Sequence, residues 1–327
     1  MRAVVITAHG GPEVLQMRDV PDPVAGPEEV LVDVVTSALN RADTLQRRGL
    51  YPGPPSEHEI PGLEFAGRVA AAGERVTEHA VGDAVMGIVG GGGYAERVTV
   101  HQRQAMAVPD ALGLDAAGAL PEVFITAWDA LVRQGGLTTG RWALVHAGAS
   151  GVGTASIQIA KAMGAHIAVT ASAGKHHVCE ALGADLVIDY AAEDFVSSVH
   201  SATGGAGVDV VLDVIGGDYL PRNVSCLRFN GRIIQVGTMA GKPVPFSPAG
   251  LMLKRAALVG TTLRARPIEE KIAVTRQFAA EMLPHVAAGA MAPVIDSRFA
   301  LADAPAAHER MEANLNAGKI VLDVSPA

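Results

Sequence analysis

A glycine-rich segment between two apolar runs constrains the fold of this chain more than any other feature. Residues 142–172 read WALVHAGASGVGTASIQIAKAMGAHIAVTAS. The outer parts are rich in valine, isoleucine and leucine, whereas the apolar residues in the middle recur at helical spacing. This pattern predicts a strand, a helix and a second strand, which is the repeating unit of a parallel sheet.

The loop inside this unit is a candidate phosphate-binding site. A helix N-terminus carries unpaired N–H groups and a partial positive charge, and small residues let the backbone approach a phosphate. Against the pattern G-x-G-x-x-G, the middle glycine is replaced by Ser150, which weakens the match. A nucleophile elbow, G-x-S-x-G, would need glycine where the chain has Val152. A plain turn without a ligand stays open, but the strand–helix context favours the cradle. The cradle comprises Gly148, Ala149, Ser150, Gly151, Val152 and Gly153.

Strand-like runs alternate with helical segments from residue 122 to residue 264. Six such runs are predicted, at residues 142–148, 166–172, 186–190, 208–217, 231–237 and 257–263. They are nearly continuous in valine, isoleucine and leucine, as expected where helices cover both faces of a parallel sheet. The region is therefore predicted to be a doubly wound Rossmann dinucleotide-binding domain.

The rest of the chain predicts a second, β-rich domain formed by two separate segments. Residues 1–121 are rich in proline and glycine and contain short strand-like runs. Residues 265–327 begin with a helical pattern and end in the strand-like runs 295–301 and 319–324. We assign 1–121 and 265–327 to one discontinuous domain, with the nucleotide-binding domain 122–264 inserted between them.

Composition excludes several classes of protein. The chain has 327 residues, of which 49% are hydrophobic and 18% charged, and its formal net charge is -8. These values indicate a globular fold and argue against a nucleic-acid partner. Two cysteines make no disulfide framework, so we expect a cytoplasmic protein. Neither a secretory signal nor a membrane span is expected, because no apolar run is long enough.

The residues that follow the second strand favour NADPH over NADH. An NAD site usually carries Asp or Glu there to bind the ribose 2′-hydroxyl, whereas an NADP site lacks the acid and provides cations. Between Thr170 and Glu180 the chain carries no acidic residue. Ser172 and Lys175 are the candidate ligands of a 2′-phosphate. The alternative for Lys175 is a solvated position at the start of a helix.

The order of these features resembles the zinc-independent quinone oxidoreductase branch of the medium-chain dehydrogenase/reductase superfamily. The resemblance spans almost the whole chain, and SALNRAD with MEANLNAGKIVL is closest to the p53-inducible quinone oxidoreductase group. It implies an α/β protein with a GroES-like catalytic domain and a Rossmann domain. The segments that carry it are residues 37–55, 60–69, 81–100, 119–131, 146–165 and 308–324.

The zinc ligands of related alcohol dehydrogenases are replaced in this chain. Those enzymes use a cysteine, a Gly-His-Glu segment and a further cysteine. Here Asn40 stands at the position of the first cysteine, and Gly62-Leu63-Glu64 replaces Gly-His-Glu. The four closely spaced cysteines of the structural zinc lobe have no counterpart. We therefore expect no metal, and Glu64 to be a buried structural carboxylate.

The resemblance implies that Asn40, Tyr51 and Asp43 line the catalytic cleft between the domains. Asn40 is expected to bind a quinone oxygen or the nicotinamide carboxamide. Tyr51 is expected to stack on a flat ring or to donate a proton, with an anchor for the loop 51–55 as the alternative. Asp43 is equally a candidate cap of the helix that follows Asn40.

The same resemblance implies further cofactor contacts. Thr126 is expected beside the nicotinamide, and Tyr190 near the adenosine ribose-phosphate. For Thr126 a bond to its own backbone is the alternative, and for Tyr190 simple packing. The remaining candidates are Gly216, Gly237, Leu263 and Asn314.

These inferences predict an NADPH-dependent, metal-independent reductase of quinones or similar conjugated carbonyls. An enoyl-thioester or enone reductase is one alternative, and a low-turnover NADPH-binding sensor or structural protein is another. The resemblance also implies a homodimer or homotetramer, in which the strand that begins at Leu258 pairs with its counterpart in a second copy.

Overall fold

The computed structural model describes residues 1–51, 53, 56–241 and 243–325. The chain forms two compact units. One comprises Met1–Val123 with Arg266–Ala327, and the other comprises Phe124–Ala265. The expected boundaries, after residues 121 and 264, lie within two residues of those in the structure. Met1–Val123 with Arg266–Ala327 is the first unit, and Phe124–Ala265 is the second unit.

The second unit contains a six-stranded parallel sheet with the order β10-β9-β8-β11-β12-β13. From β8 the chain first adds strands on one side of the sheet (β9 and β10) and then on the other (β11, β12 and β13), as in a doubly wound dinucleotide-binding fold. This topology confirms the predicted α/β class. The strands are β8 (Trp142–His146), β9 (His166–Ala171), β10 (Leu186–Asp189), β11 (Val208–Asp213), β12 (Leu227–Gln235) and β13 (Ala257–Gly260).

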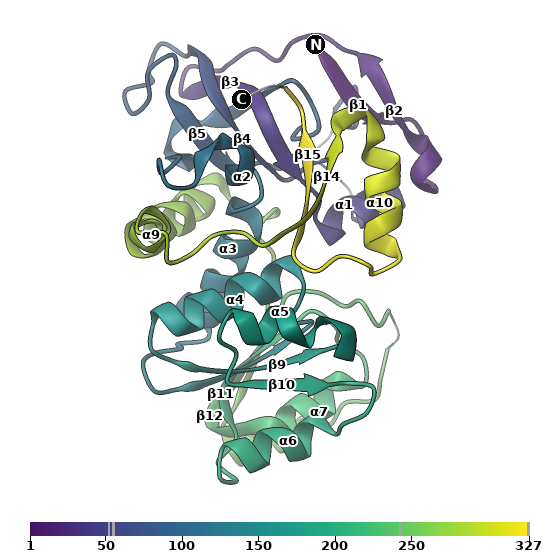
Figure 1. Cartoon of the computed structure of the whole chain (residues 1–327), viewed down its shortest axis with the longest axis vertical. Coiled ribbons are helices and arrows are strands. Elements are labelled where there is room, and N and C mark those ends of the chain that lie inside the picture. Colours follow the sequence, from purple (N-terminus) through teal and green to yellow (C-terminus); the bar gives the residue numbers. More distant parts are fainter. Residues whose placement is uncertain (52, 54–55, 242, 326–327) are drawn as a thin grey trace. The chain divides into compact units, whose positions relative to one another are not determined.

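Helices cover both faces of this sheet. Figure 1 shows α4 and α5 on one side of β9 and β10, and α6 and α7 on the other. Every residue of β11 is buried, which explains its run of valine and leucine. The helices of this part are α3 (Pro121–Trp128), α4 (Gly151–Ala162), α5 (His176–Ala181), α6 (Phe195–Ala202), α7 (Tyr219–Cys226) and α8 (Ala249–Lys254). The π-helical turn Asp129–Gln134 extends α3.

The first unit contains a seven-stranded sheet and a separate two-stranded sheet, β1-β2. The order of the larger sheet is β14-β15-β3-β4-β5-β7, with β6 paired to β3. Its strand β15 pairs antiparallel with β3, which joins the C-terminal segment to the N-terminal one. The strands are β1 (Arg2–Ile6), β2 (Leu15–Asp19), β3 (Glu29–Ala38), β4 (Glu64–Ala72), β5 (Ala84–Ile88), β6 (Arg97–His101), β7 (Ala105–Ala107), β14 (Ile295–Ala300) and β15 (Lys319–Asp323).

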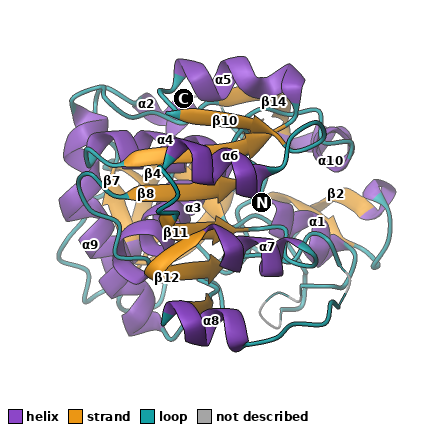
Figure 2. Ribbon diagram, turned by 90° about the horizontal axis from the view of Figure 1, so that it is seen from below, coloured by secondary structure: helices purple, strands orange, loops and turns teal. Residues whose placement is uncertain are grey.

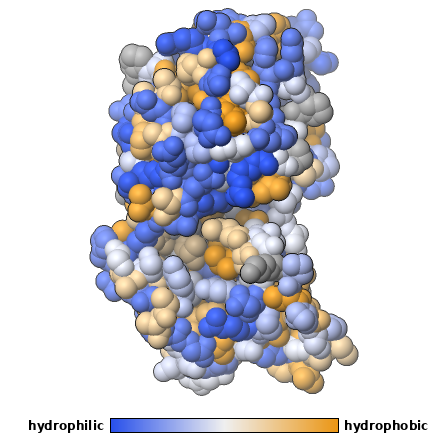
Figure 3. Space-filling model, turned by 90° about the vertical axis from the view of Figure 1, so that its right-hand side faces the viewer, coloured by the Kyte–Doolittle hydropathy of each residue, from blue (hydrophilic) through white to orange (hydrophobic). Residues whose placement is uncertain are grey.

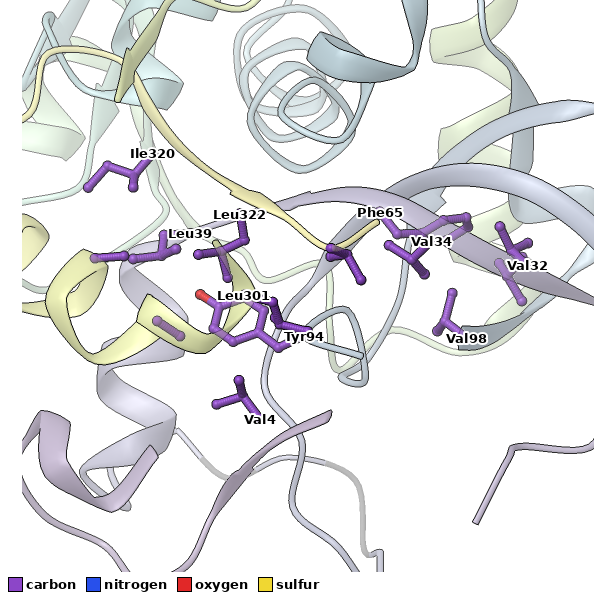
Figure 4. Packing of buried hydrophobic residues seen from close by; sticks show 14 of the residues in the cluster. Val4, Val32, Val34, Leu39, Phe65, Tyr94, Val98, Leu301, Ile320 and Leu322 are labelled. Atoms are coloured by element: carbon purple, nitrogen blue, oxygen red, sulfur yellow. The ribbon is translucent and has the colours of Figure 1, made fainter. Parts of the chain in front are cut away.

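Helices α1, α2, α9 and α10 complete the first unit, and Figure 2 shows how helices and strands are distributed in the chain. Their bounds are Arg41–Arg47, Gly113–Ala117, Ile268–Ala287 and Ala304–Glu312. The main buried cluster of this unit combines aliphatic side chains with the aromatic rings of Phe65 and Tyr94. Figure 4 shows the Tyr94 ring among Val4, Leu39 and Leu322.

The surface is mostly hydrophilic on the face drawn in Figure 3, where apolar residues form small scattered groups. Within the described residues, no helix combines the length and the apolar character needed to cross a bilayer.

Gly153 gives a test of the loop packing. A Cβ at this position would lie 2.4 Å from the carbonyl oxygens of both Ala147 and Gly148, and backbone atoms cannot easily move away. We expect Gly153→Ala to lower the stability by about 2–3 kcal/mol, as overpacking does. Gly174→Ala is the matched control, because a Cβ there meets no atom within 4 Å. Thermal unfolding followed by circular dichroism measures both, and equal melting temperatures would contradict the packing argument.

Candidate active site

The glycine loop of the second unit has the geometry of a phosphate cradle. Helix α4 begins at Gly151, and the Ser150 hydroxyl caps it by accepting the Gly153 N–H at 3.1 Å. The Gly148 N–H donates to the Thr170 carbonyl at 2.8 Å, which fixes the loop against the end of β9. A Cβ on Gly148 would lie 2.5 Å from Val169 Cβ. The loop therefore requires small residues. It lies at the start of a twelve-residue helix, whose first N–H groups are suited to bind an anion.

The end of β9 lacks a carboxylate, as the sequence shows. Ser172 is half-buried directly after the strand, and Lys175 ends a short 3-10 turn before α5. The neighbouring strand β10 ends in Asp189, whose carboxylate accepts the Ala191 N–H of its own loop at 3.0 Å. The next residue, Tyr190, is 52% exposed at this edge of the sheet. The absence of an acidic residue directly after β9 is typical of NADP sites, and contact of these residues with a 2′-phosphate stays a prediction.

A buried polar chain fixes the ends of β8, β9 and β11. Asn223 Nδ2 donates to Asp213 Oδ2 at 2.9 Å, so Asn223 Oδ1 faces His146 Nε2 at 2.7 Å. His146 consequently carries its proton on Nε2, and its Nδ1 lies 3.0 Å from the Thr170 hydroxyl as acceptor. Burial lowers the pKa of His146, which keeps it neutral.

The same chain holds the loop at Gly216. Asp213 Oδ1 accepts the Ile215 and Gly216 N–H groups at 2.6 and 3.0 Å. Gly216 has φ 67°, a left-handed conformation that suits glycine. His146, Asn223 and Asp213 were absent from the sequence-based candidates. The available signal was a histidine inside the apolar run WALVHAG.

The other expected cofactor contacts lie in several places. In the second unit, Gly237 follows β12 and its carbonyl accepts Gln235 Nε2 at 2.6 Å, whereas Leu263 is buried after β13. Thr126 is half-buried on α3. In the first unit, Asn314 follows α10 with φ 54°, and its Oδ1 accepts an Arg41 N–H at 2.7 Å. Their contacts with a cofactor stay predictions.

In the first unit, Asn40, Glu64 and Lys319 form a buried triad. Lys319 Nζ lies 2.7 Å from Glu64 Oε1 and donates to Asn40 Oδ1 at 2.7 Å. Asn40 Nδ2 in turn donates to Glu64 Oε1 at 2.9 Å. The exposed fraction of the Lys319 side chain is 3%, and that of Glu64 is 0%. Glu64 is thus the buried carboxylate that the sequence suggested, and its partner is a lysine that the sequence did not single out.

Asp43 lies next to this triad and caps helix α1. Its Oδ2 accepts the Asn40 N–H at 2.7 Å, and its Oδ1 accepts the Gly62 N–H at 3.1 Å. Burial raises its pKa to about 6. The contact with Asn40 is the expected cap, and the contact with Gly62 ties the start of α1 to the segment before β4. Contact with a substrate stays a prediction for Asp43.

Tyr51 is half-buried at the end of the turn after α1. Its expected stacking on an acceptor stays a prediction. The alternative role as a loop anchor involves Pro52, Pro54 and Pro55, which lie outside the described residues.

A directional chain of hydrogen bonds leads from Arg47 to Asp43. Arg47 can only donate, so His308 Nδ1, 3.4 Å from Arg47 Nη1, is an acceptor and the proton is on Nε2. His308 Nε2 faces the Tyr94 hydroxyl at 3.3 Å, and that hydroxyl donates to Asp43 Oδ2 at 3.3 Å. Burial, with the nearby Arg47 charge, lowers the pKa of His308 to about 3. Burial also raises the pKa of Tyr94.

Comparison with known proteins assigns the family. Residues 26–110 match the family described as alcohol dehydrogenase GroES-like domain, and residues 151–280 match zinc-binding dehydrogenase. The quinone oxidoreductase of Lama guanicoe is 32% identical over 98% of this chain and 97% of its own length. The chain belongs to the medium-chain dehydrogenase/reductase superfamily. Its nearer affinity to the p53-inducible group stays a prediction.

Solved structures of this superfamily share the fold of the whole chain. Escherichia coli quinone oxidoreductase complexed with NADPH has a TM-score of 0.88 and 29% identity, covering 99% of this chain and 100% of its own. An NAD-dependent alcohol dehydrogenase has a TM-score of 0.86 and 32% identity, covering 99% and 100%. Relatives that are about equally similar to this chain are thus described with NADPH and with NAD. The choice between the two cofactors therefore depends on residues of this chain.

The residues of this chain do not fit a zinc ion at the triad, although one matching family is described as zinc-binding. The position between Asn40 Oδ1 and Glu64 Oε1 is taken by the Lys319 ammonium. Across the described residues, no group of three or more His, Cys, Asp or Glu side chains is placed to hold a metal. An ammonium cannot accept a lone pair as zinc does, so this triad provides charge without Lewis acidity.

His308 predicts a measurable pH dependence of stability. Its pKa is about 3 when folded against 6.5 when unfolded, so below pH 6.5 protons bind the unfolded state preferentially and stability falls as pH decreases toward 3. Between pH 7.5 and pH 5 this effect amounts to about 2 kcal/mol. His308→Gln keeps one donor and one acceptor but does not titrate. Urea unfolding at both pH values should show a loss smaller by that amount in the variant. Asp43 has the opposite effect on the pH dependence of stability, but it is present in both proteins and so cancels in the comparison. Equal losses of stability in the native chain and in the variant would contradict the low pKa of His308.

Proposed function

We propose that this chain is an NADPH-dependent reductase of quinones and related conjugated carbonyls that uses no metal. The observation that carries the proposal is the Lys319 ammonium between Asn40 and Glu64, where a zinc-dependent relative would place its metal. Oxidation of an alcohol requires help in removing the hydroxyl proton, which zinc supplies. A quinone is already electrophilic and accepts a hydride without a Lewis acid.

The second unit supports the NADPH assignment. Bound NADPH would supply the hydride, and the protein's part is to bind and orient it. The loop 148–153 is suited to the pyrophosphate, and Ser172, Lys175 and Tyr190 lie at the strand edge suited to the 2′-phosphate. Gly216, Gly237 and Leu263 follow the carboxyl ends of the central and edge strands, where ligands of such sheets bind. Thr126 and Asn314 are further proposed contacts.

The first unit supports a carbonyl acceptor. One Nδ2 hydrogen of Asn40 binds Glu64, and the other makes only a 3.4 Å contact with the Ala38 carbonyl. In the proposed reaction this second hydrogen exchanges its weak contact with Ala38 for a carbonyl oxygen that gains negative charge during hydride transfer. Tyr51 would contact the flat ring of the acceptor. Asp43 would fix the start of helix α1, where Asn40 is the N-terminal cap residue.

The natural acceptor distinguishes this proposal from its two alternatives. Faster turnover of an enone or enoyl thioester than of any quinone would favour the second reductase class. Tight NADPH binding without consumption over a panel of acceptors would favour a sensor or structural role. The buried, unpaired Cys179 and Cys226 are compatible with the proposed reducing, cytoplasmic setting.

Lys175 tests the cofactor assignment. A 2′-phosphate forms a charge-assisted contact with lysine that NADH cannot form. We expect Lys175→Ala to raise KM for NADPH about tenfold and to leave KM for NADH unchanged, an effect of about 1.4 kcal/mol. Lys161→Ala is the control, because Lys161 pairs with Asp185 on the same unit. Steady-state cofactor oxidation with a small quinone measures all three proteins. Equal changes in KM for both cofactors, or better use of NADH than of NADPH by the native chain, would contradict the assignment of NADPH as the cofactor.

We also propose that β13 forms a homodimer contact by pairing with a second copy. It is the edge strand of its sheet, and Leu258 on it is 38% exposed. An open edge presents unpaired backbone groups that another strand can satisfy. Leu258→Lys should shift the mass measured by light scattering from dimer toward monomer, whereas Val24→Lys, at a residue 88% exposed on the first unit, should not. An unchanged mass for Leu258→Lys would reject this contact.

A further inference from the structure

The buried ammonium of Lys319 uses all three of its hydrogen-bond donors. It donates to the Leu39 carbonyl at 2.6 Å and to Asn40 Oδ1 at 2.7 Å, and it lies 2.7 Å from Glu64 Oε1. Glu64 is equally saturated, because its Oε2 accepts the Glu122 N–H at 2.9 Å. Both charges are therefore paired, and both groups are held by backbone atoms as well as by each other.

This arrangement allows only one orientation of the Asn40 amide. An ammonium only donates, so it must face the amide oxygen, and a carboxylate only accepts, so it must face the amide nitrogen. Rotation of the amide by half a turn would place NH₂ against the ammonium and oxygen against the carboxylate. The rotated form would set two donors against each other and two acceptors against each other, and neither pair could form a hydrogen bond.

We propose that Lys319 is a positioning residue, whose ammonium replaces a metal ion and orients Asn40 so that its second Nδ2 hydrogen faces the acceptor. Lys319 has no contact of its own with the acceptor in this scheme, and acts through the amide. The inference rests on the proposed function, since the group that receives this hydrogen is a carbonyl oxygen.

The double variant Lys319→Met/Glu64→Gln separates positioning from stability. It removes both buried charges with little change in volume, so no unpaired charge is left in the core. The Glu122 N–H should hold the oxygen of the glutamine amide introduced at position 64, which turns the nitrogen of that amide toward Asn40. Asn40 must then turn its oxygen to that nitrogen, and the donor is withdrawn from the acceptor. We expect kcat to fall about 100-fold, as for loss of a donor to a developing oxyanion, with KM for NADPH unchanged.

Asn40→Ala in both backgrounds decides the question. If Lys319 acts through Asn40, the substitution lowers kcat about 100-fold in the native chain and has no further effect in the double variant. If Lys319 is only structural, the double variant keeps its kcat and Asn40→Ala costs the same in both backgrounds, which overturns the proposal. Lys161→Met, which breaks a lysine–carboxylate pair elsewhere, should leave kcat unchanged.

A measurement without turnover covers the case in which the double variant does not fold or the native chain reduces no quinone. The side-chain NH₂ of Asn40 in the native protein, assigned by its loss in Asn40→Ala, gives two proton resonances, and the one bound to the Glu64 carboxylate should lie further downfield. In the NADP⁺-loaded protein, addition of a quinone or an enone should shift one of them and leave the one bound to Glu64 in place. A shift of the Glu64-bound resonance in place of the other, or no shift of either, would overturn the proposal. Failure of the proposed function alone would instead show as absent turnover with the selective shift retained.

Discussion

The ion pair between Lys319 and Glu64 joins parts of the first unit that are far apart in sequence. Lys319 begins β15, Glu64 begins β4, and Leu39 and Asn40 form the junction between β3 and α1. Burial of one charge without a partner costs several kcal/mol, so each of these segments must be in place for the other charge to be tolerated. The pairing of β15 with β3 brings Lys319 to the junction, and the ion pair makes that register the favourable one.

The chemistry of a tethered ammonium differs from that of a metal in the same place. Zinc in a catalytic site keeps an open position for a substrate oxygen, whereas the Lys319 ammonium has no donor left after Leu39, Asn40 and Glu64. Polarisation of a substrate oxygen must therefore come from neutral donors, of which the Asn40 amide is the one at this point. This is consistent with the proposed function, in which the acceptor is already electrophilic before it binds.

Secondary structure could be predicted from the sequence where burial of a segment gives it a periodic pattern or a distinctive composition. The parallel sheet was predicted because strands buried on both faces, such as β11, are rich in valine and leucine. Helix α7 leaves a weaker trace in the sequence, because it carries Pro221 in its first turn and several polar residues. Lys319 was missed because a lysine at the start of KIVLDV has the local pattern of a solvated strand end. Its partners are more than 250 residues away, and only the fold brings them together.

The polar networks of the two units follow one physical rule. Amide and imidazole side chains are ambiguous, since each exists in two orientations or two tautomers of similar energy. In each network a group that can only donate or only accept removes the ambiguity: Lys319 for Asn40, Arg47 for His308, and the Asp213 carboxylate for Asn223. The fixed orientation then passes along the chain, from Asn223 to His146 and from His308 to Tyr94. Buried charge in this protein thus sets the direction of hydrogen bonds at the loops and helix starts where ligands are proposed to bind. Neutral substitutes of the same size would keep the packing, but they would lose that direction.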